Sequence, residues 1–272
     1  MRWLVRFGYD GRSFAGWARQ PGLRTVEGEI RGALARLGAR RPGTEVGLDV
    51  ASRTDRGVSA LANALALRSS LAGATLLRQL NGIDPDLFFS AAAPIPEEFR
   101  VRAAVRRSYR YFHPGDGLDL GAWRRAAAVL VGELDGRSFG RGLPPALPCP
   151  RRIDAVTVSP VDGGLVIEVS ARSFVWGMVR KMIGALREHA AGRLPLARLQ
   201  EAARGETRLT LPMAEPEGLL LWNVEYPLAW TVRWKGPNRR QAERILLERE
   251  RLWTRERLLE AIEGGPPDGS CS

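Results

Sequence analysis

Short stretches in which apolar and polar residues alternate are interleaved with helical spacing in the first third of the chain. Thr25 precedes apolar residues at helical intervals, with Glu27 and Glu29 in the first turn, so a helix is expected to begin there. A second helix is predicted over 71–80. Strands are predicted over 2–7, 46–50, 60–67 and 87–92. The order of these elements is close to that of a split βαβ unit.

A similar order of strands and helices follows after residue 104. Strands are predicted over 107–112, 153–158, 165–170 and 219–226, and helices over 120–134, 174–189 and 196–203. The expected class is therefore α+β, with two ferredoxin-like or RRM-like halves over 1–104 and 105–228. Each half is expected to carry an antiparallel or mixed sheet, and the two sheets to face each other across a basic cleft.

The last segment, 229–272, reads as a charged extension with a disordered end around Cys271. Within it, 239–263 carries both signs of charge and apolar residues at roughly helical spacing. Two interpretations stay open for this helix: an amphipathic helix packed on the body, or an appendage that contacts RNA. The proline- and glycine-rich link over 140–150 is expected to be a loop.

Composition narrows the function classes. Of 272 residues, 41 are Lys or Arg and 30 are Asp or Glu, a net charge of +11, which favours a polyanionic partner such as nucleic acid. Only two residues are lysine, so a single arginine is weak evidence of phosphate recognition. Two cysteines and two distant histidines leave no disulfide framework, CxxC zinc site or Ser–His triad. With no signal peptide and no apolar run of about 20 residues, a soluble cytoplasmic protein without membrane contact is expected.

One carboxylate stands out, that of Asp55 in the run from Arg53 to Val58. It lies between two arginines, in a segment where Thr54 and Gly57 favour a tight turn. Neighbouring guanidinium groups favour the ionised carboxylate, which can act as a nucleophile or a base. A salt-bridged turn aspartate is the competing interpretation.

Four segments in the same order resemble the tRNA pseudouridine synthase A family: 14–20, 53–58, 106–111 and 174–184. The run from Arg53 to Val58 is similar to the Arg-Thr-Asp-x-Gly-Val core of that family's signature loop. The resemblance extends from about Trp3 to Pro227. It implies an RNA pseudouridine synthase, an isomerase that acts on tRNA and needs no cofactor, no nucleotide and no metal.

The resemblance also implies roles for individual side chains. Asp55 is the essential carboxylate, and whether it adds to C6, attacks C1′ or acts as a base is left open. Arg180 is its expected partner, with Lys181 as the rival. Tyr109 is expected to stack on the target base. Arg53 is a candidate for filling the vacated position in the RNA or for binding a neighbouring phosphate.

Other residues are weaker candidates. Tyr111 lies two residues after Tyr109 on the same predicted strand, so both side chains should point to the same face of the sheet. A place in the core and a place in the site are equally consistent with this position. The arginines expected to contact the RNA backbone are Arg19, Arg102, Arg106 and Arg107. The resemblance further implies a homodimer and target uridines at positions 38, 39 and 40 of the anticodon stem-loop.

Alternatives of other kinds stay open. The chain could modify other tRNA uridines, or it could be a non-catalytic protein that binds or folds tRNA. A third alternative is a metal-dependent nuclease, for which the pair Asp49 and Asp55 would have to hold Mg²⁺.

Overall fold

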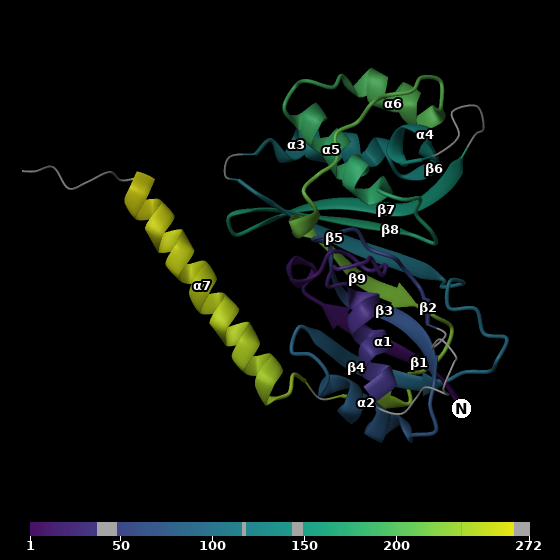
Figure 1. The fold of residues 1–272 in the computed structure, drawn as a ribbon. Helices are drawn as coiled ribbons and strands as arrows, with labels where there is room; N and C mark the ends of the chain where they lie inside the picture. The colour runs from purple at the N-terminus through teal and green to yellow at the C-terminus, as the bar shows by residue number, and fades with distance from the viewer. Residues whose placement is uncertain (37–47, 116–117, 143–148, 235, 264–272) are drawn as a thin grey trace, which may run out of the picture.

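The computed structural model describes residues 1–36, 48–115, 118–142, 149–234 and 236–263. Part of the strand predicted at 46–50, the middle of the proline-rich link and the tail around Cys271 lie outside these residues. The α+β class is confirmed (Figure 1). Strands predicted over 2–7, 60–67, 87–92, 107–112, 153–158, 165–170 and 219–226 are confirmed.

The described residues form one ten-stranded sheet in the order β10-β4-β1-β3-β9-β5-β8-β7-β6, with β2 paired on β3. Its strands are β1 (Arg2–Tyr9), β2 (Asp49–Val50), β3 (Ser59–Arg68), β4 (Leu87–Pro94), β5 (Arg106–Pro114), β6 (Gly132–Asp135), β7 (Pro150–Val161), β8 (Gly164–Ala171), β9 (Leu219–Glu225) and β10 (Val232–Arg233).

Helices lie over each half of this sheet (Figure 1). They are α1 (Val26–Arg36), α2 (Gly73–Asn81), α3 (Leu120–Val129), α4 (Gly136–Phe139), α5 (Met178–Ala190) and α6 (Leu196–Arg204). Helix α7 (Arg239–Glu263) stands away from the sheet, and 3₁₀ turns are found at η1 (Gly11–Ser13) and η2 (Pro216–Gly218). Helix α1 begins where expected, and the Thr25 hydroxyl accepts a hydrogen bond from the Gly28 amide at 3.2 Å. Helix α5 buries Met178 and Met182 in the core, which leaves Arg180 on another face.

The two halves share one sheet instead of two sheets that face each other. Strand β9 runs parallel to β3, pairing Ser59 with Leu220 and Ala60 with Leu221. The short β2 pairs with β3 only at Leu65 and Ala66, so the first residues of β3 offer open hydrogen-bonding groups to β9. Because of this junction, the turn that precedes β3 lies beside the C-terminal half.

Two predicted helices are shorter than expected, and a glycine explains each difference. The helix predicted over 120–134 ends at Val129; Gly132 has a φ of 97° and begins strand β6. The helix predicted over 174–189 begins only at Met178, because Gly177 has a φ of 74°. Positive φ is incompatible with a continuing right-handed helix and is readily adopted only by glycine.

The predicted C-terminal helix is confirmed as α7, but its apolar residues do not pack on the body (Figure 1). It begins with a reciprocal cap: the Gln241 amide donates to Asn238 Oδ1 at 2.9 Å, and the Asn238 amide donates to Gln241 Oε1 at 2.8 Å. Asn238 also donates to the carbonyl of Asn81 at 2.6 Å, which ties this end of α7 to α2. Within the described part of the chain, no helix has the length and apolar character that crossing a membrane requires.

Candidate active site

Asp55 lies in a tight turn between β2 and β3. The Val58 amide donates to the Asp55 carbonyl at 3.2 Å, and Gly57 has a φ of 84°, as the sequence predicted. A Cβ at Gly57 would lie 2.9 Å from Glu217 Oε1 and 3.0 Å from Pro216 Cγ. The turn therefore requires glycine both for its backbone angle and for its contact with η2.

Two buried groups of the N-terminal half hold this turn. The Tyr9 hydroxyl and the Thr54 hydroxyl form a hydrogen bond at 2.7 Å, and burial raises the pKa of Tyr9. The Trp17 amide donates to the Thr54 carbonyl at 3.1 Å, which attaches the loop after η1 to the turn. Thr54 thus fixes the residue next to Asp55 through both its backbone and its side chain.

Each carboxylate oxygen of Asp55 has a donor from the C-terminal half. Arg180 Nη1 lies 3.0 Å from Oδ2, and the Trp176 indole N–H donates to Oδ1 at 2.8 Å. Arg180 is itself fixed, because its Nε donates to the Ala214 carbonyl at 2.7 Å. Lys181, the rival partner, points elsewhere and donates to the Gly140 carbonyl at 2.9 Å.

Trp176 lies in the short loop before α5 and is 59% exposed. The Arg141 guanidinium stacks over its ring at 4.4 Å, and the Arg141 amide donates to the Trp176 carbonyl at 2.9 Å. Gly177 follows with positive φ and turns the chain into α5. An aromatic side chain is therefore held beside the carboxylate while one side of it stays open to solvent.

Tyr109 on β5 lines the same space, with its ring edge-on to Phe174 at a centroid distance of 5.3 Å. Burial raises the pKa of Tyr109, although the Ser52 hydroxyl and Arg107 oppose that shift, so the phenol stays neutral at physiological pH. Tyr111 also points to this face of the sheet but is buried in the hydrophobic core. The core alternative for Tyr111 is confirmed.

These groups line a cleft of about 1010 Å³ between the two halves. Asp55 is the only acidic residue among its described lining residues. Six arginines line it: Arg53, Arg56, Arg102, Arg107, Arg141 and Arg180. Such a cleft attracts a polyanion, and one carboxylate is placed where the polyanion would lie.

The arginines expected to contact RNA lie in different places. Arg53 and Arg102 are exposed on the cleft wall, and Arg19 is an exposed residue between Ala18 and Gln20 of the lining. Arg106 alternates with Arg107 along β5, projects to the opposite face of the sheet and lies 3.5 Å from Asp154.

Arg107 is 7% exposed, and its donors are used inside the protein. Its Nη2 donates to the carbonyls of Ala51 at 3.0 Å and Arg102 at 2.8 Å, and its Nε donates to the Ser52 hydroxyl at 3.1 Å. Its Nη1 donates to the Arg172 carbonyl. Arg107 therefore joins the segment before the Asp55 turn to the C-terminal half, a structural position that the sequence pattern did not reveal.

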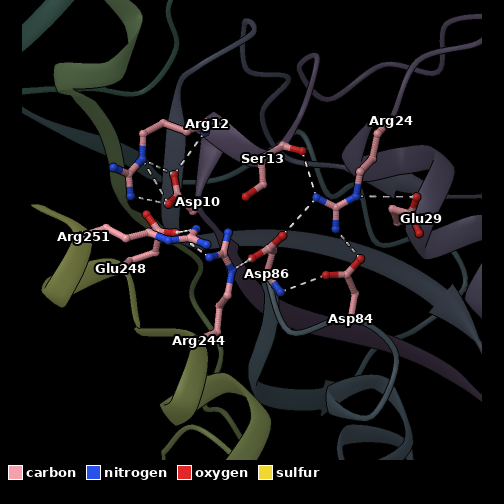
Figure 2. A network of polar contacts seen from close by, with 10 residues as sticks. All are labelled: Asp10, Arg12, Ser13, Arg24, Glu29, Asp84, Asp86, Arg244, Glu248 and Arg251. Carbon is pink, nitrogen blue, oxygen red and sulfur yellow. Dashed lines mark hydrogen bonds and ion pairs between the residues drawn. The ribbon is translucent and has the colours of Figure 1, made fainter. Parts of the chain in front are cut away.

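A polar network supports the loop on the other side of the cleft (Figure 2). Arg24 Nη2 lies 2.6 Å from Asp84, and its Nη1 donates to the Ser13 carbonyl at 2.9 Å and to Asp86 at 3.0 Å. The Arg24 carbonyl accepts from the Ala15 amide at 2.8 Å, at the start of the lining segment. Arg244 of α7 binds the second oxygen of Asp86 at 3.0 Å.

Comparison with known proteins shows the family of this chain. The family model described as tRNA pseudouridine synthase matches residues 126–227. The protein named tRNA pseudouridine synthase A of Thermococcus kodakarensis is 39% identical over 232 residues, 84% of this chain and 85% of its own length. The protein of the same name from Thermococcus onnurineus is 37% identical, over 92% of this chain and 93% of its own length. That from Methanothrix thermoacetophila is also 37% identical, over 85% of this chain and 85% of its own length. The chain belongs to the tRNA pseudouridine synthase A family. It is an RNA pseudouridine synthase, an isomerase.

Within this pseudouridine synthase, several residues of the site were not predicted from the sequence. Trp176 stands four residues before Arg180 in a segment that carries the resemblance, but nothing local indicates that its N–H reaches Asp55. Nothing in the sequence around Arg141 indicates that this residue belongs to the site. Asp49 lies outside the cleft lining, 3.9 Å from Arg2, and the described residues contain no group of three or more potential metal ligands.

Proposed function

We propose that this chain converts uridine to pseudouridine in tRNA, with Asp55 as the essential carboxylate. The observation that carries the proposal is one carboxylate, held on both oxygens, which among the described lining residues is the only acidic group beside six arginines. Phosphate groups of RNA are attracted to the arginines, and the carboxylate faces the base or sugar that enters.

The reaction breaks the C1′–N1 bond of the target nucleotide and forms a C1′–C5 bond. The proton on C5 is lost and N1 gains one, so substrate and product are isomers. Asp55 either adds to the substrate or removes a proton from it. In each case its oxygens must be oriented, and the donors from Arg180 and Trp176 supply that orientation.

The target base has to leave its stack before it can reach Asp55, at a cost of a few kcal/mol. Tyr109 lies on the cleft wall with Phe174 against its ring, and we assign it the face on which the uracil stacks. Arg53 fills the vacated place in the RNA or binds the adjacent phosphate. Arg102 and Arg19 supply backbone contacts, and the buried position of Arg107 assigns it to positioning the Asp55 turn instead.

The proposed targets are uridines 38, 39 and 40 of the anticodon stem-loop, modified by a homodimer. The test uses unmodified tRNA transcripts with uridines at these and other positions, and maps pseudouridine by carbodiimide treatment and primer extension. Stops at 38, 39 or 40 are expected. Stops only at other positions would keep the reaction and refute the target, and tight binding without stops would favour a tRNA-binding protein.

A further inference from the structure

Three basic side chains lie together at the border of the cleft. They are Arg141 in the loop after α4, Lys181 on α5 and Arg208 in the segment after α6. Helices α4, α5 and α6 pack beside one another over the C-terminal half (Figure 1). The Lys181 ammonium donates to the Ser138 carbonyl at 3.3 Å, and the Ser138 hydroxyl accepts from the Leu209 amide at 3.0 Å. These bonds bring the three segments to one place, and Arg141 lines the cleft itself.

This basic cluster, Arg141, Lys181 and Arg208, has no acidic partner in the part of the chain that the structure describes, because no carboxylate there lies within ion-pair distance of the three. An arginine close to it is paired, since Arg137 lies 2.8 Å from Asp135. Three positive charges without a counter-charge repel one another and attract an anion.

Lys181 also has a donor to spare. An ammonium group has three N–H bonds, and two of them go to the carbonyls of Ser138 and Gly140. The third has no partner among the described residues. Burial lowers the pKa of Lys181, and the charges of Arg208 and Arg141 lower it further. An anion bound among the three side chains would relieve this repulsion and take the remaining donor.

Arg141 connects the basic cluster with Asp55. Its guanidinium lies over the Trp176 ring at 4.4 Å, and the Trp176 indole donates to Asp55 Oδ1 at 2.8 Å. The donors of a guanidinium lie in its own plane, so stacking on its face leaves them free for an oxygen at its edge. Arg141 can therefore hold an anion and the Trp176 ring at the same time.

We propose that Arg141, Lys181 and Arg208 bind a phosphate group of the RNA, and that Arg141 is a positioning residue through which this phosphate keeps the Trp176 N–H on Asp55. The inference rests on the proposed function, because the RNA that enters the cleft supplies the phosphate. Position 141 requires a planar guanidinium, whereas the other two positions require only a positive charge.

The first test measures tRNA affinity against salt concentration for wild type and Arg208→Gln. Arg208 is exposed and has no hydrogen-bond partner among the described residues, so its replacement leaves the fold intact. Loss of one phosphate contact is expected to make the slope of log affinity against log salt shallower by about 0.7–0.9. The matched control is Arg78→Gln, since Arg78 is also exposed and unpaired within the described chain but lies on α2, outside the cleft lining. Equal slopes for Arg208→Gln and the control would overturn the phosphate site.

A second measurement separates a phosphate of the RNA from free phosphate, which the same donors could bind. Thermal unfolding is followed while inorganic phosphate replaces chloride at constant ionic strength. Similar unfolding temperatures for wild type and Arg208→Gln at every phosphate concentration are expected. A site that takes a free anion instead would give stabilisation of wild type alone and no change in the tRNA slope, and that result would refute the inference.

Arg141→Lys tests the positioning role, because it keeps the charge and loses the flat face. A cation–π contact at an exposed site is worth a factor of about two to five, so kcat is expected to fall by that factor, with KM and the salt slope unchanged. In a Trp176→Phe background the N–H is already absent, and Arg141→Lys is expected to cause no further fall. Full kcat for Arg141→Lys, or the same fall in both backgrounds, would refute the role.

The phosphate site and the proposed reaction fail separately in these tests. Pseudouridine formed by wild type, with equal salt slopes for wild type and Arg208→Gln, would refute the phosphate site and keep the reaction. A shallower slope for Arg208→Gln, with no pseudouridine from wild type, would keep the phosphate site and refute both the reaction and the positioning role of Arg141.

Discussion

At the scale of single residues, the site depends on how the two oxygens of Asp55 are held. Arg180 supplies a charged donor to Oδ2, and Trp176 supplies a neutral donor to Oδ1. Both donors come from the segment around the start of α5, and both have a second contact of their own, with Ala214 and Arg141. The carboxylate therefore has little freedom to rotate before a substrate arrives.

Replacing Trp176 with Phe tests this orientation, because the ring is kept and the N–H donor is lost. A hydrogen bond to a charged group contributes about 1.5–3 kcal/mol, so kcat for pseudouridine formation is expected to fall about tenfold or more, with little change in KM. Trp222→Phe is the matched control. Trp222 also lies under an arginine, Arg110 at 3.6 Å, but on the opposite face of the sheet, and its replacement should leave kcat unchanged.

At the scale of elements, the turn from Asp55 to Val58 and the start of α5 are brought together by the junction of β3 with β9. The turn at Gly57 and the helices with clear apolar spacing could be predicted from the sequence. The ends of two helices could not be predicted, because Gly132 and Gly177 adopt positive φ inside otherwise helical patterns and interrupt the helix. The pairing of Trp176 with Asp55, 121 residues apart, follows from sheet topology and has no local signal.

Gly57→Ala tests the turn against a matched glycine. Gly57 and Gly163 have φ values of 84° and 71°, so an alanine at either position loses about 1–2 kcal/mol of stability. Only at Gly57 would the new Cβ meet neighbours, because Gly163 has open space around it. Thermal unfolding should show a loss of stability for both variants. In an activity assay, Gly163→Ala should form pseudouridine like wild type, whereas Gly57→Ala should lose pseudouridine formation. Equal activity in the two variants would contradict the role of the turn.

The network of Figure 2 predicts a pH dependence. Burial would raise the pKa of Asp86, but hydrogen bonds from Arg244 and Arg24 outweigh it and hold that pKa below its ordinary value of 3.8. The ionised Asp86 carboxylate therefore stabilises the folded protein above pH 3.8, and this stabilisation is lost as the pH falls through the lower pKa that Asp86 has in the folded state. Asp86→Asn should destabilise the protein by about 1–2 kcal/mol near pH 7, and the difference from wild type should shrink in acid.

Denaturant unfolding at several pH values measures this difference. Asp154→Asn is the control, because Asp154 is an exposed residue and its carboxylate lies 3.5 Å from Arg106 in a long ion pair. Surface pairs of that kind contribute little, so its unfolding free energy should match wild type at each pH. A difference for Asp86→Asn that stays constant into acid would show that the carboxylate charge is not what stabilises the network.

At the scale of the whole molecule, the sheet carries the two halves as one unit and leaves a cleft where their loops meet. The net charge of +11 already pointed to a polyanion, but only the fold shows that six arginines and a single carboxylate of the described residues share this cleft. The separate expectation of two sheets was wrong because local patterns do not specify which strand edges join across a long sequence separation. The helices predicted in each half are present, with different ends for the two that were predicted over 120–134 and 174–189.

The most direct test of the account is pseudouridine formation by wild type and by Asp55→Asn on one unmodified tRNA transcript, with tRNA binding measured in parallel. Asn keeps the size of the side chain and removes its charge. Wild type is expected to form pseudouridine, Asp55→Asn is expected to form none, and the two proteins are expected to bind tRNA with similar affinity. Pseudouridine formed by Asp55→Asn at the wild-type rate would contradict the account.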